Sequence, residues 1–267
     1  MSIPRLIALD VDGTLLTSSH ELHERTTAAI ARVRNNGVIV TIATGRPAAA
    51  IGHVGTHADF LIAGNGTTVV EMVNGEPGPI PYDRILARDR VAPLVMAMRA
   101  ALPGLGIALV TAREMVNESG FERIVPPSAP IGRRVADALE ADGDDFRSIV
   151  VFHADHPVDD LQAMLNPLMP HDLALRNAGL EAVELFEVDI DKGQTLAWLA
   201  SSLGIEQREV WAFGDAVNDH EMLAWAGRGH AMGNADEATM AIANVVVPTN
   251  DHHGVAVTLD AIAFANR

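Results

Sequence analysis

The sequence contains no cysteine, so it can form no disulfide, hold no thiolate-bound zinc and use no cysteine nucleophile. It also lacks an uncharged run near the roughly 20 apolar residues that a membrane span needs. The richest apolar stretch, residues 91–110, is interrupted by Arg99 and by Pro103. The first ten residues lack the basic start and apolar core of a secretory signal. These absences predict a cytoplasmic protein without membrane attachment.

Basic residues are scarce: 19 lysines and arginines face 35 aspartates and glutamates, which gives a net charge of −16. This balance argues against a basic groove for nucleic acid. The composition, 48% hydrophobic and 20% charged, is that of a globular protein. At roughly 150 residues per domain, the length predicts just under two domains. No long heptad pattern is present, so monomer and homodimer both stay open.

Both ends of the chain alternate between strand and helix patterns. Such alternation predicts an α/β fold, a Rossmann-like doubly wound parallel sheet with helices on both faces. The predicted strands cover residues 6–11, 38–43, 60–63, 209–213 and 243–247. The predicted helices cover residues 21–36, 194–203, 218–225 and 255–265.

The middle of the chain has a pattern of its own and reads as an inserted α+β domain. Its helices are predicted over residues 89–102 and 158–169, and its strands over 106–111, 147–153 and 182–188. Proline- and glycine-rich stretches lie at its start, GEPGPIPYDR, and inside it, VPPSAPIG. We therefore expect a core made of residues 1–83 and 190–267, with an insert over residues 84–189.

Two aspartates, Asp10 and Asp12, follow the first predicted strand and precede Gly13. That position is the carboxyl end of a strand, where open α/β sheets bind their ligands. An acidic turn would explain the same residues, since Asp and Gly favour turns. An EF-hand calcium loop does not, because its glycine is the sixth residue and Gly13 is the fourth from Asp10.

Three further polar clusters lie at strand ends or helix starts. Thr44-Gly45-Arg46-Pro47 ends the second strand, beside N–H groups that could bind an anion. Asp215, Asn218 and Asp219 follow the strand at residues 209–213, where a simple helix N-cap would also explain them. The third cluster contains Lys192, the only lysine, at the start of a helix, where a cation opposes the helix dipole. This placement favours a functional role for it.

The order DVDGTLL, TGRP, DKG and GDAVND resembles the haloacid dehalogenase superfamily of phosphohydrolases. The 147 residues between Thr44 and Lys192 leave room for the large inserted cap of its Cof-type subfamily (type IIB). Gly64-Asn65-Gly66, AMGNA at residues 231–235 and GVA at residues 254–256 fit the same pattern. The match covers about residues 3–83 and 186–265, while the insert shows little specific resemblance.

The resemblance implies a magnesium-dependent phosphatase that acts on small phosphorylated metabolites through an aspartyl-phosphate. It makes Asp10 the nucleophile and Asp12 the general acid and base. Mg²⁺, a hard cation that oxygen ligands suit, would be held by Asp10, the carbonyl of Asp12, Asp215 and Asp219, the last through water. Phosphate and substrate binding is assigned to Thr44, Gly45, Arg46, Lys192, Asn218 and Asn65.

Three other functions rely on residues of similar kinds. A phosphotransferase or phosphomutase could use the same core if an acceptor replaced water. A non-catalytic ligand sensor could keep the fold, but it would not need Asp10, Asp12, Lys192 and Asp215 together. Dinucleotide binding needs G-x-G-x-x-G after the first strand, and Gly64-Asn65-Gly66 has no third glycine in register.

Overall fold

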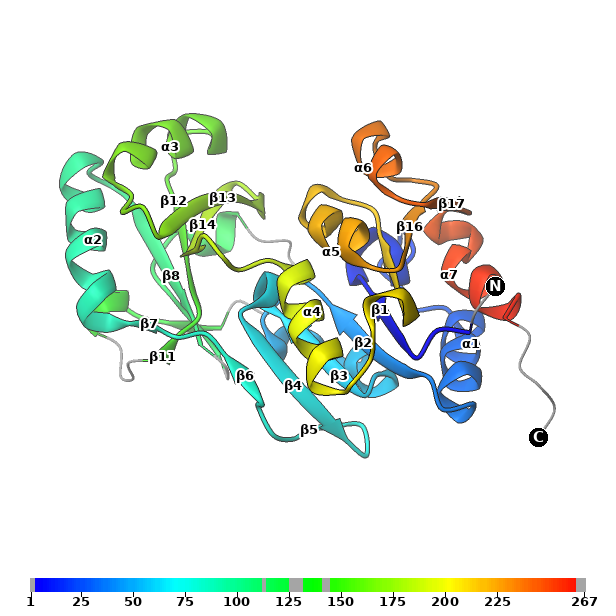
Figure 1. Ribbon diagram of the computed structural model, residues 1–267. Coiled ribbons are helices and arrows are strands. Elements are labelled where there is room, and N and C mark those ends of the chain that lie inside the picture. Colours follow the sequence, from blue (N-terminus) through cyan, green and yellow to red (C-terminus); the bar gives the residue numbers. More distant parts are fainter. Residues whose placement is uncertain (1–2, 112–113, 125–131, 141–144, 263–267) are drawn as a thin grey trace. The chain divides into compact units, whose positions relative to one another are not determined.

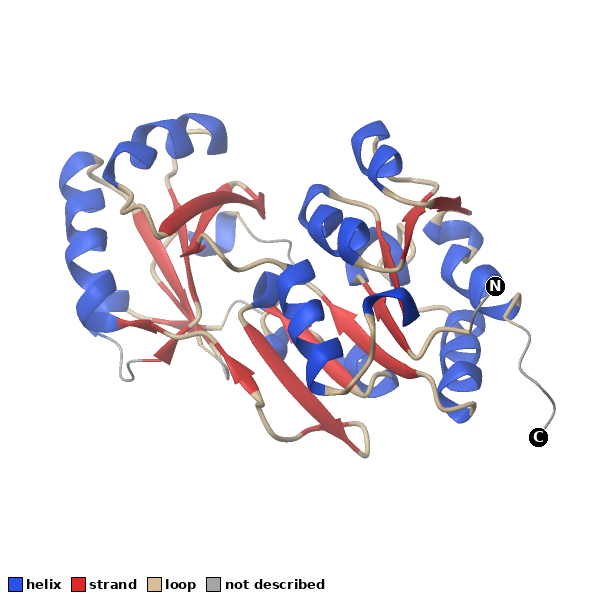
Figure 2. Cartoon of the chain, viewed as in Figure 1, coloured by secondary structure: helices blue, strands red, loops and turns tan. Residues whose placement is uncertain are grey.

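The computed structural model describes residues 3–111, 114–124, 132–140 and 145–262 (Figures 1 and 2). The chain divides into two compact units. The first consists of Met1–Arg46, Ile51–Tyr82 and Asp191–Arg267, and the second of Pro47–Ala50 and Asp83–Ile190. Within the described residues, no helix is both long enough and apolar enough to cross a membrane.

The first unit is built on a sheet in the order β17-β16-β15-β1-β2-β3-β4-β5. The strands from β17 to β3 pair in parallel, and β4 and β5 extend the sheet as an antiparallel hairpin. Every residue of β1 is buried, as expected for a parallel strand covered on both faces. The strands are β1 (Leu6–Leu9), β2 (Ile39–Ala43), β3 (Phe60–Ala63), β4 (Thr68–Val73), β5 (Glu76–Pro77), β15 (Val210–Gly214), β16 (Arg228–Met232) and β17 (Val245–Val247).

Helices cover both faces of this sheet (Figure 1). On one face, α4 (Lys192–Ser202) and α5 (His220–Trp225) pack on Leu6, Ala8 and Ala212. Helices α1 (Glu24–Asn35) and α7 (Gly254–Asp260) pack together, and α6 (Glu237–Ile242) follows β16. The N-cap Asp191 starts α4 because its carboxylate accepts the N–H of Gln194 at 2.7 Å.

The second unit has a six-stranded sheet in the order β10-β9-β8-β12-β14-β13. Alternate residues of its strands, such as Leu109 and Ile149, form a core with α2 (Arg88–Ala101) and α3 (Val158–Leu165). The intervening residues form a smaller cluster around Phe121. The strands are β8 (Gly106–Val110), β9 (Met115–Asn117), β10 (Arg133–Arg134), β12 (Ser148–Phe152), β13 (Leu173–Leu180) and β14 (Ala182–Glu187), with β7 (Leu86–Ala87) and β11 (Asp145–Phe146) as a separate pair; β6 (Tyr82–Asp83) lies at the boundary of the units.

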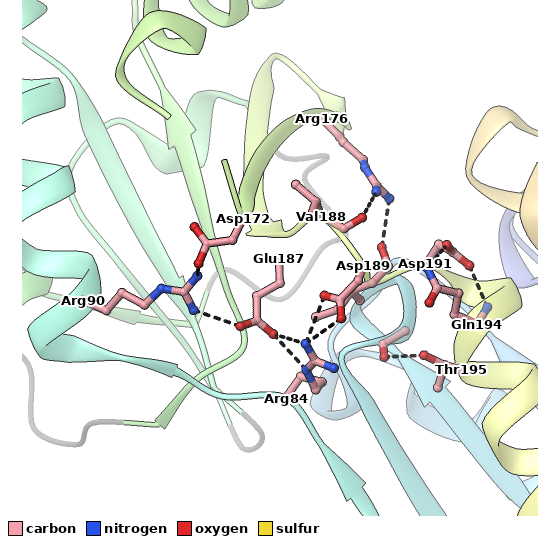
Figure 3. Close-up of polar contacts among 12 residues, drawn as sticks. Arg84, Arg90, Asp172, Arg176, Glu187, Val188, Asp189, Asp191, Gln194 and Thr195 are labelled. Atoms are coloured by element: carbon pink, nitrogen blue, oxygen red, sulfur yellow. Dashed lines mark hydrogen bonds and ion pairs between the residues drawn. The ribbon is translucent and has the colours of Figure 1, made fainter. Parts of the chain in front are cut away.

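The segments at which the second unit begins and ends are tied together by charge (Figure 3). Arg84 donates to Glu187 at 2.8 Å and to Asp189 at 3.0 Å. Arg90 joins the same Glu187, at 2.9 Å, to Asp172. Two arginines therefore share one carboxylate of β14, and they link the entry of the unit to its exit.

The predicted fold class is confirmed: a parallel sheet core is covered by helices on both faces, and a mixed α/β insert is present. The antiparallel β4 was not predicted, nor was β16, where Gly229 and His230 interrupt the apolar run. The helix predicted over residues 158–169 ends as an α-helix at Leu165, and a 3-10 turn over Asn166–Leu168 follows it. The helix predicted over residues 255–265 ends at Asp260, and its last three residues, like most of the segment VPPSAPIG, lie outside the described residues.

The core of the second unit gives a stability prediction. Ile149 is fully buried between the sheet and its two helices. We expect Ile149→Ala to lower the free energy of unfolding by about 2–5 kcal/mol, because the cavity adds to the lost transfer energy. Urea unfolding followed by circular dichroism measures it. Met96 on α2, with 57% of its surface exposed, is the control, and Met96→Ala should change stability by no more than about 0.5 kcal/mol. Equal effects of the two changes would contradict this core.

Candidate active site

The site forms where the parallel strands of the first unit end. Asp10 follows β1, Thr44 follows β2, Gly64 follows β3 and Asp215 follows β15. These strands are neighbours in the sheet, so their carboxyl ends meet at one edge. Residues that are up to about 200 positions apart in the sequence are thereby brought within hydrogen-bond distance.

Lys192 lies at the centre of this edge. It is the first residue of α4 and its side chain is fully buried. Its Nζ donates to Asp10 Oδ1 and to Asp219 Oδ1, each at 2.7 Å. A buried ammonium is tolerated only when it is paired and hydrogen-bonded, and these two carboxylates provide both conditions. The side chain therefore fixes the nucleophile predicted from the sequence relative to the loop after β15.

Asp219 is fully buried, and both of its oxygens have hydrogen-bond donors. Oδ1 accepts from Lys192, and Oδ2 accepts the backbone N–H groups of Asp215, at 3.0 Å, and Ala216, at 3.1 Å. Its carboxylate thus closes the loop that presents Asp215.

The charges of the site work against one another. Burial raises the pKa of Asp10, and Asp219 adds to the rise, outweighing the opposite effect of Lys192. Burial by itself would lower the pKa of Lys192, but Asp10 and Asp219 raise it well above its usual range. Burial also raises the pKa of Asp215 to about 6, against the lowering effect of its hydrogen bond from Thr14. Lys192 therefore stays protonated, whereas Asp10 and Asp215 resist ionisation. A cation added beside these two carboxyl groups would favour their ionised forms.

The donor set fits a hard divalent cation. Carboxylate oxygens of Asp10, Asp215 and Asp219 lie within 4.8 Å of one another. Oxygen-only donors at this spacing suit Mg²⁺, which keeps several waters. The side chain of Asp12 points to Arg46 instead, so only its carbonyl is left to serve as the predicted ligand.

Two residues that the sequence analysis did not single out make contacts of the loop after β1, one from that loop and one that follows β16 (Arg228–Met232). Thr14 donates through Oγ1 to Asp215 Oδ1 at 2.9 Å, and Asn234 donates through Nδ2 to the carbonyl of Gly13 at 2.9 Å. Gly13 has φ +81°, and a Cβ there would lie 2.1 Å from Asp215 Oδ2. Thr14 belongs to the motif DVDGT and Asn234 to the motif AMGNA. The motifs therefore contain both residues, but the sequence does not tell which of their side chains make these contacts.

The remaining predicted residues form a second cluster after β2 and β3. Thr44 is buried, and its Oγ1 accepts the N–H of Arg46 at 3.1 Å. Asn218 donates to the Oδ1 of Asn65 at 3.1 Å, which links the loop after β15 to the loop after β3. A Cβ at Gly45 would lie 3.0 Å from that same Asn65 oxygen. The side chain of Arg46 differs from those of the other residues predicted to bind phosphate, because its guanidinium is held by Asp12.

Comparison with known proteins identifies the family of the chain. A model of the haloacid dehalogenase-like hydrolase family matches residues 7–259. An HMP-PP phosphatase from Citrobacter koseri is 32% identical over 244 residues, which cover 86% of this chain and 85% of that protein. The solved structure of a haloacid dehalogenase-like hydrolase from Bacteroides thetaiotaomicron matches with a TM-score of 0.85 and 26% identity, covering 97% of this chain and 100% of that one. A haloacid dehalogenase subclass IIB sugar phosphatase shares the fold, with a TM-score of 0.80 and 21% identity over 96% of this chain and 98% of its own.

The chain therefore belongs to the haloacid dehalogenase-like hydrolase family, and the family predicted from its motifs is confirmed. Within that family it is a phosphatase, a phosphoric monoester hydrolase of the Cof type.

The raised pKa of Asp215 predicts a pH-dependent cost to stability. The pKa of this carboxyl is about 6 in the folded state, against an ordinary value of 3.8 in the unfolded chain. Its ionisation therefore lowers the free energy of unfolding increasingly as the pH rises from about 4 to 6, and the loss is complete above pH 6. We expect Asp215→Asn to stabilise the protein in chelator by about 1–2 kcal/mol at pH 8, a value reduced for solvent screening, and by much less at pH 4.5. Thermal unfolding at the two pH values measures it.

Asp236 provides a control of opposite sign. It is exposed, and the backbone N–H of Thr239 lowers its pKa, so its charge stabilises the fold above its ordinary pKa. Asp236→Asn should therefore lower the melting temperature at pH 8. A melting temperature of Asp215→Asn at or below that of the unchanged protein at pH 8 would contradict the expected cost of ionising the partly buried Asp215.

Lys192 predicts a second outcome, at the level of activity. Arginine keeps the charge, but its planar fork is wider than an ammonium, and the buried space between Asp10 and Asp219 is fitted to one nitrogen at 2.7 Å from each. We expect Lys192→Arg to lower kcat/KM for phosphate release at least about 100-fold. Arg208→Lys, at a side chain with 79% exposure, is the matched control and should be unchanged. Near-normal activity of Lys192→Arg would show that position 192 needs only a positive charge.

Proposed function

We propose that the protein is a magnesium-dependent phosphatase that hydrolyses small phosphorylated metabolites through an aspartyl-phosphate formed on Asp10. The observation that carries this proposal is the fully buried Lys192, held at 2.7 Å from both Asp10 and Asp219. A phosphate monoester is an anion, and a carboxylate nucleophile repels it unless cationic groups neutralise the charge first. Lys192 supplies one such group, bonded to the other oxygen of the attacking carboxylate.

The steps follow from the positions of these side chains. Asp10 Oδ1 is held by Lys192, so Oδ2 is the oxygen available to attack phosphorus. As the new bond forms, the bond to the leaving oxygen breaks, and Asp12 donates a proton to that oxygen. Asp12 then takes a proton from the water that attacks the aspartyl-phosphate, which releases phosphate and restores Asp10. Thr44 and Lys192 bind phosphoryl oxygens, with Asn218, Asn65 and Gly45 beside them.

A bound Mg²⁺ would neutralise further charge on the phosphoryl group, held by Asp10, the carbonyl of Asp12 and Asp215, with Asp219 behind them. The support is the 4.8 Å grouping of carboxylate oxygens and the closed loop around Asp215. Such an ion would also offset the burial and the repulsion by Asp219 that raise the pKa of Asp10 and Asp215.

For the substrate, we propose a small metabolite whose leaving group the second unit selects. The similarity to an HMP-PP phosphatase, at 32% identity over 86% of this chain, makes the substrate of that enzyme the first compound to test. We propose that the insert, expected over residues 84–189, serves as the cap, and the compact segment Asp83–Ile190 supports this proposal. Cytoplasmic location and a monomeric or homodimeric state stay predictions from the sequence.

Phosphate release from 4-nitrophenyl phosphate tests the proposal. We expect release that requires Mg²⁺ and falls at least about 10³-fold in Asp10→Asn, because the neutral amide is no nucleophile. Asp59→Asn is the control for loss of an acidic side chain, because Asp59 belongs to the same unit but pairs with Arg34. A panel of phosphorylated metabolites, HMP-PP included, follows.

The alternatives predict different results in the same assay. A phosphotransferase or phosphomutase would release phosphate only slowly without an acceptor and faster with one. A ligand sensor would bind phosphorylated compounds and release no phosphate from any member of the panel. Release that persists in Asp10→Asn would overturn the assignment of the nucleophile.

A further inference from the structure

The guanidinium of Arg46 holds the carboxylate of Asp12 by two parallel hydrogen bonds. Nε donates to Oδ2 at 2.8 Å, and Nη2 donates to Oδ1 at 2.5 Å. This two-point geometry fixes the plane of a carboxylate as well as its position, which a single contact cannot do. Both side chains are partly exposed, 34% for Arg46 and 48% for Asp12, so without the pair Asp12 would have room to turn.

The backbone of Arg46 is itself fixed to the site. Its N–H donates to Thr44 Oγ1 at 3.1 Å, and its carbonyl accepts the N–H of Gly64 at 3.0 Å. These two hydrogen bonds fix the backbone of Arg46 between the loops after β2 and β3. The pair with Asp12 connects those loops to the loop after β1, which carries the nucleophile Asp10.

We infer that Arg46 is a positioning residue for the general acid and base, rather than one of the phosphate ligands that the sequence suggested. This inference rests on the proposed function and assigns one of its residues a different role. The two hydrogen bonds fix the plane and the position of the Asp12 carboxyl, so the loop after β2 sets the direction in which its oxygens point.

The inference makes a distinction between substrates. An alkoxide leaving group needs a proton as its bond to phosphorus breaks, so its departure depends on the orientation of Asp12. Nitrophenolate is a stable anion and leaves without one. A residue that orients Asp12 therefore matters for an alkyl phosphate and little for 4-nitrophenyl phosphate. A residue that binds the phosphoryl group matters equally for both, because that group is common to them.

The experiment compares kcat/KM for these two substrates in the full-length protein with Mg²⁺. This parameter covers the steps up to release of the leaving group and excludes hydrolysis of the aspartyl-phosphate. The alkyl substrate is the alkyl phosphate of the panel that the unchanged protein hydrolyses best. We expect Arg46→Met to lower kcat/KM about 30- to 100-fold for the alkyl phosphate and less than about 3-fold for 4-nitrophenyl phosphate. Arg46→Lys, which keeps one of the two contacts, should fall between Arg46→Met and the unchanged protein on the alkyl phosphate.

A matched control exists in the same unit. Arg34 makes a two-point pair with Asp59, with Nε and Nη2 at 3.2 and 2.6 Å, and its side chain has a similar exposure of 32%. Arg34→Met removes an equivalent ion pair away from the predicted acid and base, so it should affect both substrates alike or neither. Combining Arg46→Met with Asp12→Asn should cost no more on the alkyl phosphate than Asp12→Asn alone, since the positioned group is already gone.

Two results would overturn the inference. Equal losses on the two substrates in Arg46→Met would return Arg46 to phosphate binding. No loss on either would make the contact a surface ion pair of the ordinary, weak kind. Failure of the proposed function looks different, since it would appear as phosphate release that survives Asp10→Asn, whatever Arg46 does.

Discussion

The active-site edge depends on one buried ion pair network, in which the ammonium of Lys192 joins Asp10 and Asp219. Removing any one of the three leaves a charge buried without its partner, which is among the most costly changes a protein interior can suffer. The network is also what orders the loops. The second oxygen of Asp219 accepts two N–H groups of the loop that carries Asp215. Asp10 follows β1 directly. Charge and backbone geometry are thus fixed together.

The same network explains why a lysine at a helix start is tolerated. Lys192 opens α4, where the helix dipole disfavours a cation, but its neighbour Asp191 caps the helix with a carboxylate. The unfavourable dipole term is of the order of 1 kcal/mol, whereas two charge-assisted hydrogen bonds in a buried site exceed it. In a chain whose other 18 basic residues are arginine, the one lysine stands where a single compact nitrogen must reach two acids at once.

The parallel core and the residues grouped at its edge could be predicted from the sequence because both follow from local rules. Buried parallel strands are continuous apolar runs, and their polar ends share one edge of the sheet. The strand β16 could not be predicted, since Gly229 and His230 break its apolar pattern and only the neighbouring strands make it part of the sheet. The antiparallel β4 was missed although its residues, TVVEMV, are rich in β-branched side chains. The contacts of Arg46 could not be predicted either. Its position in the motif TGRP says that it lies at the edge, but the choice between phosphate and Asp12 depends on side-chain direction, which no spacing encodes.

The second unit is stabilised mainly by apolar packing. It has its own core between a six-stranded sheet and two helices, and its ends are joined by Arg84, Glu187 and Asp189. All the residues predicted to carry the chemistry belong to the first unit, including Lys192, which comes directly after the boundary. Substitutions in the second unit can therefore change its surface while the paired charges of the site stay intact. That separation explains why the sequence identifies a reaction through four motifs, whereas the insert shows no motif that names a substrate. A fold that divides in this way keeps the charged groups of the site in one unit and leaves the surface of the other free to vary without disturbing them.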